Sequence, residues 1–385
     1  MSPNVIKGGE RNPGIDALRG ISIILVIVNH LSIRYPLYKT SISNVIPALI
    51  LNILAHQGHG SVFIFFVISG FLITSNITKR ENGLRSINLA EFYSRRFARI
   101  APCLFLLVII LTILGYVRVD NFAINNPSQS LGGAAFSALG IHLNWYECLT
   151  GYLPANWDVL WSLSIEEAFY IAFPLFCLLL SRSEKVQFAA FSLFACSLPL
   201  IMFLMAASPT IWRHKAYTPG MAAISAGVAA AIVAPHLRTR PALVGWVGTT
   251  VLTTAVVVSS VSSVLTADYL MIFVTGGTAG ALIAFSHGWG RRLAGRSSAW
   301  VRSFGMMSYE VYLTHMFAVF FIMWVYGASG LPFTSSWVAF PITLGLSWLI
   351  GYSVDRFFSY PADRWLRRAF RDVVRNPSVI RQTST

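Results

Sequence analysis

The apolar stretch Leu18-Arg-Gly-Ile-Ser-Ile-Ile-Leu-Val-Ile-Val-Asn-His-Leu31 carries two ionisable side chains, Arg19 and His30, which lie eleven positions apart. A helix turns by about 100° per residue, so both side chains fall on nearly one face. At about 1.5 Å per residue, His30 lies roughly 16 Å further along the helix than Arg19. Ionisable groups inside a bilayer are costly, so this pair predicts a functional site within a membrane-spanning helix.

The composition predicts a polytopic membrane protein. Of the 385 residues, 55% are hydrophobic and only 11% are charged. Several apolar runs are long enough to cross a bilayer. We therefore expect an all-α transmembrane helix bundle of about ten helices, over residues 17–33, 58–77, 97–117, 165–181, 186–206, 217–235, 243–264, 269–287, 304–326 and 337–358. The shorter apolar stretches near 45–55 and 131–145 are more typical of re-entrant or interfacial segments.

The net charge of +14 is explained by membrane topology. If the N-terminus is cytoplasmic, 24 of the 29 Lys and Arg residues fall on the inner side of the predicted helices. This bias predicts that both termini are cytoplasmic. It also accounts for the basic composition without a nucleic-acid partner, although the anionic lipid of the inner leaflet will be attracted.

We expect a single membrane domain over residues 1–375 and a short tail over 376–385. Neither a cleavable signal peptide nor an appended soluble domain is expected, so the chemistry should take place within the bundle or at its faces. The four cysteines are scattered and form no C-x-x-C pair. This spacing predicts neither a disulfide framework nor a metal site. The basic stretch Arg364-Trp-Leu-Arg-Arg368 suits the inner membrane interface.

His30 is the first candidate for catalysis. Imidazole is the side chain that ionises nearest neutral pH, so it can act as a base and then as an acid. The alternative is a structural histidine that is hydrogen-bonded to a neighbouring helix. Arg19, taken alone, is equally consistent with an anchor at the inner surface of the membrane.

The block Asn156-Trp-Asp-Val-Leu-Trp-Ser-Leu-Ser-Ile-Glu-Glu-Ala-Phe-Tyr170 carries two adjacent acids, Glu166 and Glu167. Ser164 followed three residues later by Glu167 is the pattern of a capping box, which predicts a helix start at Ser164. Only one of the two acids is needed for that role. We expect the other to reach His30 and orient its ring, because a carboxylate that orients an imidazole is a general catalytic device.

A third block, Ser308-Tyr-Glu-Val-Tyr-Leu-Thr-His315, places Glu310 and His315 within a predicted membrane helix. The cost of burying them indicates that both side chains face the bundle interior or a cavity. The alternative is that they are structural partners of polar residues elsewhere in the bundle.

Three arginines, Arg95, Arg96 and Arg99, lie at the inner end of the third predicted helix. Guanidinium groups bind phosphate oxygens in a bidentate manner, which favours a site for a nucleotide-like donor. Anchoring at the inner surface is the alternative. At the opposite end, His59 could line the same cavity as His30, or it could lie at the level of the lipid headgroups.

Taken in order, five blocks of the chain resemble the acyltransferase-3 family of integral membrane O-acyltransferases. They are Ile15–Gly20 followed by His30, Phe65–Leu72, Arg95–Pro102, Trp161–Tyr170 and Ser308–His315. Each block alone is a weak pattern, but the ordered set is specific and extends over nearly the whole chain.

This resemblance implies transfer of an acyl group, commonly acetyl, from cytosolic acyl-CoA to a hydroxyl. The donor is then a substrate, and no permanently bound cofactor is expected. The residues that the resemblance assigns to catalysis are His30, Arg19, Glu167, Glu166 and His315, and those that it places near the CoA are Arg95, Arg96 and Arg99.

The acceptors of the family are often sugars of polysaccharide, lipopolysaccharide, peptidoglycan or lipo-oligosaccharide. A glycan or lipid-linked sugar acceptor and a location in the bacterial plasma (inner) membrane are therefore implied. Secreted small molecules, including macrolide sugars, are acceptors of some members. A transporter or flippase of acylated cargo is a further alternative, but it predicts an inverted repeat, and none is evident. Direct transfer is slightly favoured over an acyl-enzyme, because no G-x-S-x-G motif is present.

Overall fold

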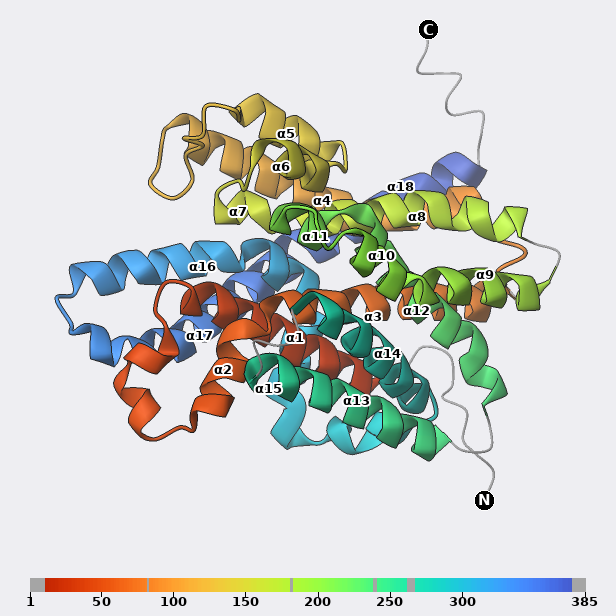
Figure 1. The fold of residues 1–385 in the computed structure, drawn as a ribbon. Coiled ribbons are helices and arrows are strands. Elements are labelled where there is room, and N and C mark those ends of the chain that lie inside the picture. The colour runs from red at the N-terminus through yellow and green to blue at the C-terminus, as the bar shows by residue number, and fades with distance from the viewer. Residues whose placement is uncertain (1–10, 82, 181–182, 238–240, 262–266, 376–385) are drawn as a thin grey trace, which may run out of the picture.

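The chain folds as a bundle of helices, and the described residues contain no β-strand (Figure 1). The structure is a computed structural model that describes residues 11–81, 83–180, 183–237, 241–261 and 267–375. The helices are α1 (Pro13–Ser32), α2 (Ala48–His56), α3 (Gly58–Glu81), α4 (Leu89–Tyr116), α5 (Leu131–Leu139), α6 (Leu143–Thr150), α7 (Ala155–Asp158), α8 (Trp161–Leu179), α9 (Glu184–Cys196), α10 (Leu198–Leu204), α11 (Thr210–Lys215), α12 (Tyr217–Val233), α13 (Pro241–Val261), α14 (Ala267–Ser286), α15 (Ala299–Met306), α16 (Ser308–Ala328), α17 (Ala339–Val354) and α18 (Tyr360–Arg375). The tail predicted over 376–385 lies outside the described residues.

Ten segments of the described chain are long and apolar enough to cross a membrane, which confirms the predicted number. They are Pro13–Ser32, Gly58–Glu81, Leu89–Tyr116, Ala155–Leu179, Glu184–Leu204, Thr210–His236, Pro241–Val258, Tyr269–Ser286, Ser308–Ala328 and Phe333–Arg371. The third helix begins at Leu89, earlier than predicted. The reason is that the Asn88 side chain accepts a hydrogen bond from the backbone N–H of Glu91 and caps the helix there.

Ser164 does not begin a helix, and the predicted capping box is wrong. Helix α8 begins at Trp161, so Ser164 already lies inside it. The Ser164 hydroxyl donates to the carbonyl of Leu160 at 3.3 Å and accepts from the backbone N–H of Leu143 at 3.2 Å. Glu167 has no capping role, and its carboxylate makes a tertiary contact instead.

Helix α1 lies at the centre of the bundle and packs against α3, α15 and α16 (Figure 1). Its start is fixed by Asn12, whose side-chain oxygen accepts hydrogen bonds from the N–H groups of Gly14 and Ile15. Pro13 occupies the first helical position, where a missing N–H costs nothing. The stretch that carries Arg19 and His30 is thus a helix, as predicted.

Helices α3 and α12 approach each other closely because each has a glycine at the contact. A Cβ atom on Gly70 would lie 1.9 Å from the carbonyl oxygen of Ile224. A Cβ atom on Gly227 would lie 1.9 Å from the carbonyl oxygen of Val67. Small residues at helix contacts of this kind are typical of membrane bundles.

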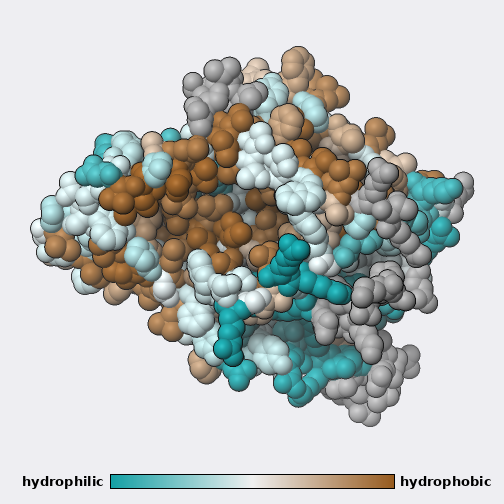
Figure 2. All heavy atoms as spheres, turned by 90° about the horizontal axis from the view of Figure 1, so that it is seen from below, coloured by the Kyte–Doolittle hydropathy of each residue, from teal (hydrophilic) through white to brown (hydrophobic). Residues whose placement is uncertain are grey.

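Large apolar side chains cover much of the outside of the bundle. Figure 2 shows them across the centre of one face, with hydrophilic side chains gathered toward one end. On α4, Ile109 and Ile113 are each 56% exposed. Such surfaces fit a lipid environment. We call the end at which α3 ends and α4 begins the basic end, because it carries Arg80 and Arg95, and the opposite end the loop end.

Candidate active site

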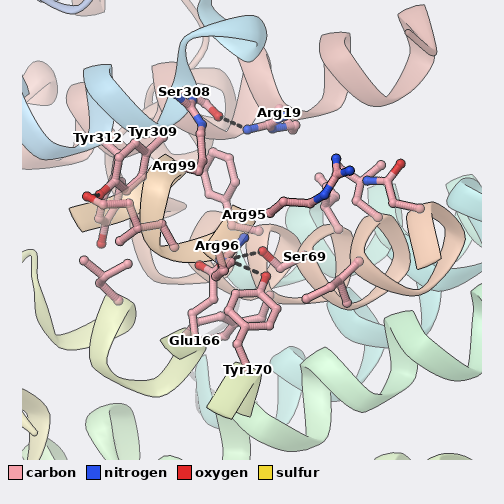
Figure 3. Close-up of a pocket in the computed structure, with 18 of the residues that line it drawn as sticks. Arg19, Ser69, Arg95, Arg96, Arg99, Glu166, Tyr170, Ser308, Tyr309 and Tyr312 are labelled. Atoms are coloured by element: carbon pink, nitrogen blue, oxygen red, sulfur yellow. Dashed lines mark hydrogen bonds and ion pairs between the residues drawn. The ribbon is translucent and has the colours of Figure 1, made fainter. Parts of the chain in front are cut away.

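A cavity of about 400 Å³ extends from the basic end into the bundle (Figure 3). Side chains from α1, α3, α4, α8, α16 and α18 line it. Its charged residues are Arg19, Arg80, Arg95, Arg96, Arg99 and Arg367, together with Glu81 and Glu166. We call it the arginine cavity. The excess of guanidinium groups over carboxylates suits a polyanionic ligand.

One face of α3 forms a wall along the whole length of this cavity. The lining residues recur along the helix and are Val62, Phe65, Phe66, Ile68, Ser69, Leu72, Ile73, Asn76, Ile77, Arg80 and Glu81. From Val62 to Arg80 the helix advances by 18 residue steps, which correspond to about 27 Å. The cavity is therefore elongated, and it suits a chain-like ligand that has its charged part at the basic end.

Arg96 lies at the centre of a polar cluster on the cavity wall (Figure 3). Its Nη2 is 3.0 Å from Oε1 of Glu166 and 2.9 Å from Oε1 of Glu167. Its guanidinium carbon lies 3.5 Å from the centre of the Tyr170 ring. The hydroxyl groups of Tyr170 and Ser69 both donate to Glu166. The two acids thus hold Arg96 and join α4 to α8.

Arg99 is likewise neutralised by a carboxylate. Its Nη1 and Nη2 donate to the two oxygens of Glu310 at 2.6 and 3.1 Å, and Glu310 is fully buried. Arg95 pairs with Glu91, one turn earlier on α4. Each of the three arginines predicted to bind the donor therefore has a carboxylate partner. All three line the arginine cavity, and their role in binding the donor stays a prediction.

Two further arginines of this cavity were missed by reasoning from the sequence. Arg80 comes from the end of α3, and Arg367 comes from α18. Arg367 belongs to the stretch that was predicted to lie at the lipid interface, so its basic character was noticed but its place in the cavity was not. Arg19 lies deeper, where its Nη2 donates to the Ser308 hydroxyl at 2.8 Å.

A second pocket, of about 150 Å³, lies at the loop end and is lined by His30. His59 lines the same pocket, which is one of the two alternatives that the sequence left open, together with His214 and Trp161. The centres of the His59 and His214 rings are 4.5 Å apart, and the His59 ring stacks on Trp161 at 5.9 Å. We call this the histidine pocket. Its aromatic rings and imidazoles offer both stacking and proton-accepting groups.

The ring of His30 lies beside the ring of a second histidine, His315. The ring centres of the two histidines are 5.2 Å apart. Glu166 and Glu167 contact Arg96 on another part of the bundle, so the expected contact with His30 is not formed. The geometry differs because α8 presents its acids to α4, which the sequence of α8 alone does not reveal.

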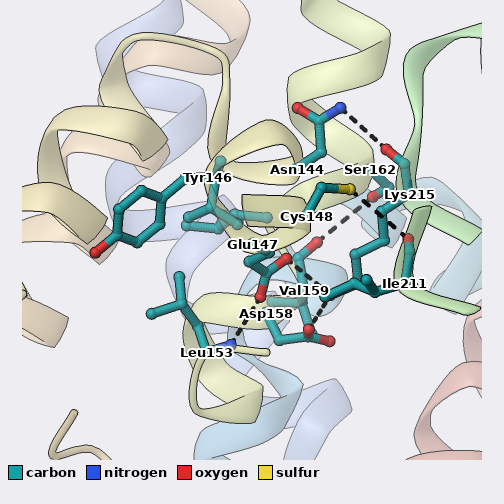
Figure 4. A network of polar contacts seen from close by, with 12 residues as sticks. Asn144, Tyr146, Glu147, Cys148, Leu153, Asp158, Val159, Ser162, Ile211 and Lys215 are labelled. Carbon is teal, nitrogen blue, oxygen red and sulfur yellow. Dashed lines mark hydrogen bonds and ion pairs between the residues drawn. The ribbon is translucent and has the colours of Figure 1, made fainter. Parts of the chain in front are cut away.

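A buried charged network borders the histidine pocket (Figure 4). Nζ of Lys215 donates to Oε2 of Glu147 at 2.7 Å and also contacts Asp158. Burial and the neighbouring Asp158 raise the pKa of the Glu147 carboxyl, and the Lys215 ammonium opposes this rise. Lys215 and Asp158 line the pocket. The sequence did not predict this pairing, because Glu147, Asp158 and Lys215 lie on three separate short helices.

The two cavities are lined by different residues except at one place. Val62 and Tyr312 line both the arginine cavity and the histidine pocket. A polyanionic chain that enters the arginine cavity from the basic end can therefore come close to an imidazole that is reached from the loop end. Among the described residues, no group of three or more His, Cys, Asp or Glu side chains is arranged to hold a metal ion.

Comparison with known proteins gives the family. The profile of the acyltransferase domain matches residues 12–352. Peptidoglycan O-acetyltransferase OatA of Listeria monocytogenes is 28% identical over 180 residues, which are 45% of this chain and 25% of that protein. O-acetyltransferase OatA of Staphylococcus aureus is 30% identical over 198 residues, 48% of this chain and 28% of that protein.

The matched regions cover less than a third of the length of either relative. No solved structure matches the chain. The family profile, by contrast, covers most of the chain and includes all five motif blocks. The chain therefore belongs to the acyltransferase-3 family of membrane acyltransferases.

Proposed function

We propose that this protein is a membrane O-acyltransferase that moves an acetyl group from acyl-CoA to a hydroxyl of a glycan or lipid-linked sugar. The observation that carries the proposal is the meeting of the arginine cavity and the histidine pocket at Val62 and Tyr312. A donor from one end of the bundle and an acceptor from the other can react there. The relatives named as O-acetyltransferases, one of them acting on peptidoglycan, support the same chemistry.

The donor enters from the basic end. The excess of positive charge at that end favours a cytoplasmic orientation, with both termini on the same side, in the plasma (inner) membrane of a bacterium. Arg80, Arg95 and Arg367 line the cavity where the phosphates of CoA would bind. The pantetheine arm then follows the face of α3, and its thioester reaches the level of Val62.

His30 is the general base of the proposed reaction. It removes the proton of the acceptor hydroxyl, and the oxygen attacks the thioester carbonyl carbon directly. The carbon–sulfur bond breaks, and the CoA thiolate leaves and accepts from His30 the proton that the hydroxyl lost. Arg19 lies on the same helix face in the arginine cavity, where it would approach the donor. Glu166 and Glu167 contribute by holding Arg96.

The acceptor enters from the loop end. Trp161 and His59 offer flat rings on which a sugar can stack, and Asp158 offers an acceptor for sugar hydroxyls. Surface polysaccharide, lipopolysaccharide, peptidoglycan and lipo-oligosaccharide all present such rings. A secreted small molecule that carries a sugar has the same chemistry, and the test below separates these pools.

The test follows label from acetyl-labelled CoA into glycan, lipid and small-molecule pools of membranes that contain the protein. His30→Ala should lower the transfer by about 10²–10⁴-fold, the usual contribution of a general base. His56→Ala is the matched control, because His56 is exposed on α2 and lines neither cavity, and it should transfer label normally. Transfer by His30→Ala at the rate of the unaltered protein would overturn the proposal.

A further inference from the structure

The thioester and the base approach each other from different compartments. The arginine cavity includes Arg19 but not His30, and His30 lines the histidine pocket. An acyl group that is delivered along α3 must therefore pass the place where the two compartments adjoin. The size of that passage limits which acyl groups can reach His30.

Tyr312 is one side of the passage, and hydrogen bonds hold its ring in place. Its hydroxyl donates to the carbonyl of Val159 at 2.9 Å and lies 2.8 Å from the hydroxyl of Ser162, from which it can accept. Val159 lies just before α8 and Ser162 lies in its first turn, whereas Tyr312 is on α16. The ring cannot swing aside without breaking these bonds.

Val62 is the other side of the passage. It is 7% exposed and belongs to α3, the helix that forms the long wall of the arginine cavity. A β-branched side chain in a helix has essentially one rotamer, so it does not turn away to make room. Two stiff side chains on separate helices therefore border both compartments and limit the room between them.

The pocket beyond the passage is small. In the proposed orientation the CoA arm lies in the arginine cavity, so the acyl chain points ahead of the sulfur and enters the histidine pocket. That pocket has about 150 Å³, against about 400 Å³ for the arginine cavity, and it must also admit the acceptor hydroxyl. Each added methylene of the acyl chain takes space from the acceptor.

We propose that Val62 and Tyr312 select short acyl groups and make the enzyme specific for acetyl over longer chains. This inference rests on the proposed acyltransferase function. A single methylene in a fitted pocket changes the specificity by about 10–200-fold. Removing the γ-methyl groups of Val62 enlarges the space where the two compartments adjoin and should relax this selection.

The experiment measures kcat/KM for acetyl-, propionyl- and butyryl-CoA with the full-length protein in membranes. The unaltered protein should prefer acetyl to butyryl by at least about tenfold, and Val62→Ala should raise the butyryl-to-acetyl ratio by about tenfold. Tyr312→Phe, which loses both hydrogen bonds but keeps the ring, should raise the ratio in the same direction. It provides a second reading if Val62→Ala folds poorly.

Val67→Ala is the matched control. Val67 is fully buried on the same helix but lines neither cavity, so this variant should keep the ratio of the unaltered protein. Normal acetyl transfer with an unchanged ratio in both Val62→Ala and Tyr312→Phe would overturn this inference alone. Failure of the unaltered protein to use any acyl-CoA would instead overturn the proposed function.

Discussion

The ring of His315 lies 5.2 Å from the ring of His30, so that two imidazoles from α16 and α1 are neighbours inside the bundle. Nδ1 of His315 is 2.7 Å from the carbonyl oxygen of Tyr312. A carbonyl only accepts, so Nδ1 carries a proton. Nε2 is buried and has no hydrogen-bond partner among the described residues. We infer that His315 positions His30 rather than reacting itself.

Replacing His315 should therefore affect turnover more than donor binding. We expect His315→Leu to lower kcat by about tenfold or more, yet by less than the loss from His30→Ala, because the base itself remains. The KM for acetyl-CoA should stay within about twofold, because His315 lines neither cavity. Steady-state kinetics in membranes would measure both constants.

The control for this variant is His236→Leu. His236 also contacts a carbonyl of its own helical segment, that of Ile232, but lies away from both cavities. It should leave kcat unchanged. A His315→Leu enzyme with normal kcat and a raised KM would contradict the positioning role.

Arg367 should contribute to donor binding from the last helix. Its side chain reaches the arginine cavity, and its Nε donates to Asp363 at 2.7 Å within α18. A hydrogen bond to a charged group is worth about 1.5 kcal/mol or more, so Arg367→Ala should raise the KM for acetyl-CoA by roughly tenfold. The kcat should change little, because Arg367 is far from the passage at Val62.

Arg371→Ala provides the comparison, because Arg371 lies one turn further along α18 and is exposed. It has the same charge but does not line the cavity. Equal KM values for the two variants would show that Arg367 acts only by adding positive charge to α18, as Arg371 does, and makes no contact with the donor.

The helices were predictable because a membrane span depends on length and composition alone. Ten apolar runs are read directly from the chain, and ten segments of the described residues meet the criteria for a span. The relation of Arg19 to His30 was also predictable, since both belong to one helix whose geometry is known. In the structure Arg19 lines the arginine cavity and His30 lines the adjoining histidine pocket, as expected for residues at opposite ends of one helix face.

The partners of the acids were not predictable, because they depend on how helices pack. Glu310 pairs with Arg99 across 211 positions of sequence, and Glu167 pairs with Arg96 across 71. Ser164 followed by Glu167 fits a capping box locally, but α7 and the turn before Trp161 already lead into the helix. Tertiary contacts overrode the local pattern there.

Arg96 should contribute more to stability than an arginine in the first turns of a helix usually does. Its removal leaves Glu166 and Glu167 adjacent, both partly buried, and without their shared cation. Loss of one partner of a buried ion pair costs about 3–5 kcal/mol, and Arg96→Met should approach the lower figure because the cluster retains some exposure. Thermal unfolding in detergent would measure this loss.

The double variant Arg96→Met with Glu167→Gln distinguishes an electrostatic cause from lost packing. It removes one of the two stranded carboxylates, so it should recover part of the lost stability. If the double variant unfolds as easily as Arg96→Met, the two acids do not repel each other enough to matter, and the arginine acts mainly through its contact with Tyr170.

Lys215 should be required for the structure of the loop end. Its side chain is 4% exposed and bridges Glu147 of α6 to Asp158 of α7, so it ties these two short helices to the end of α11. Lys215→Met keeps much of the volume but strands two carboxylates, and we expect a loss of about 3–5 kcal/mol of folding free energy. Acyl transfer should fall too, because Lys215 and Asp158 line the pocket of His30.

Lys39→Met is the matched control, because Lys39 is an exposed lysine of the same end of the bundle, and it should unfold like the unaltered protein. Adding Glu147→Gln to Lys215→Met should restore part of the stability, since one buried charge is removed with its partner. The network would be dispensable if Lys215→Met unfolded at the same temperature as Lys39→Met. In that case the loop end would be held by the buried Trp157 and its apolar neighbours instead.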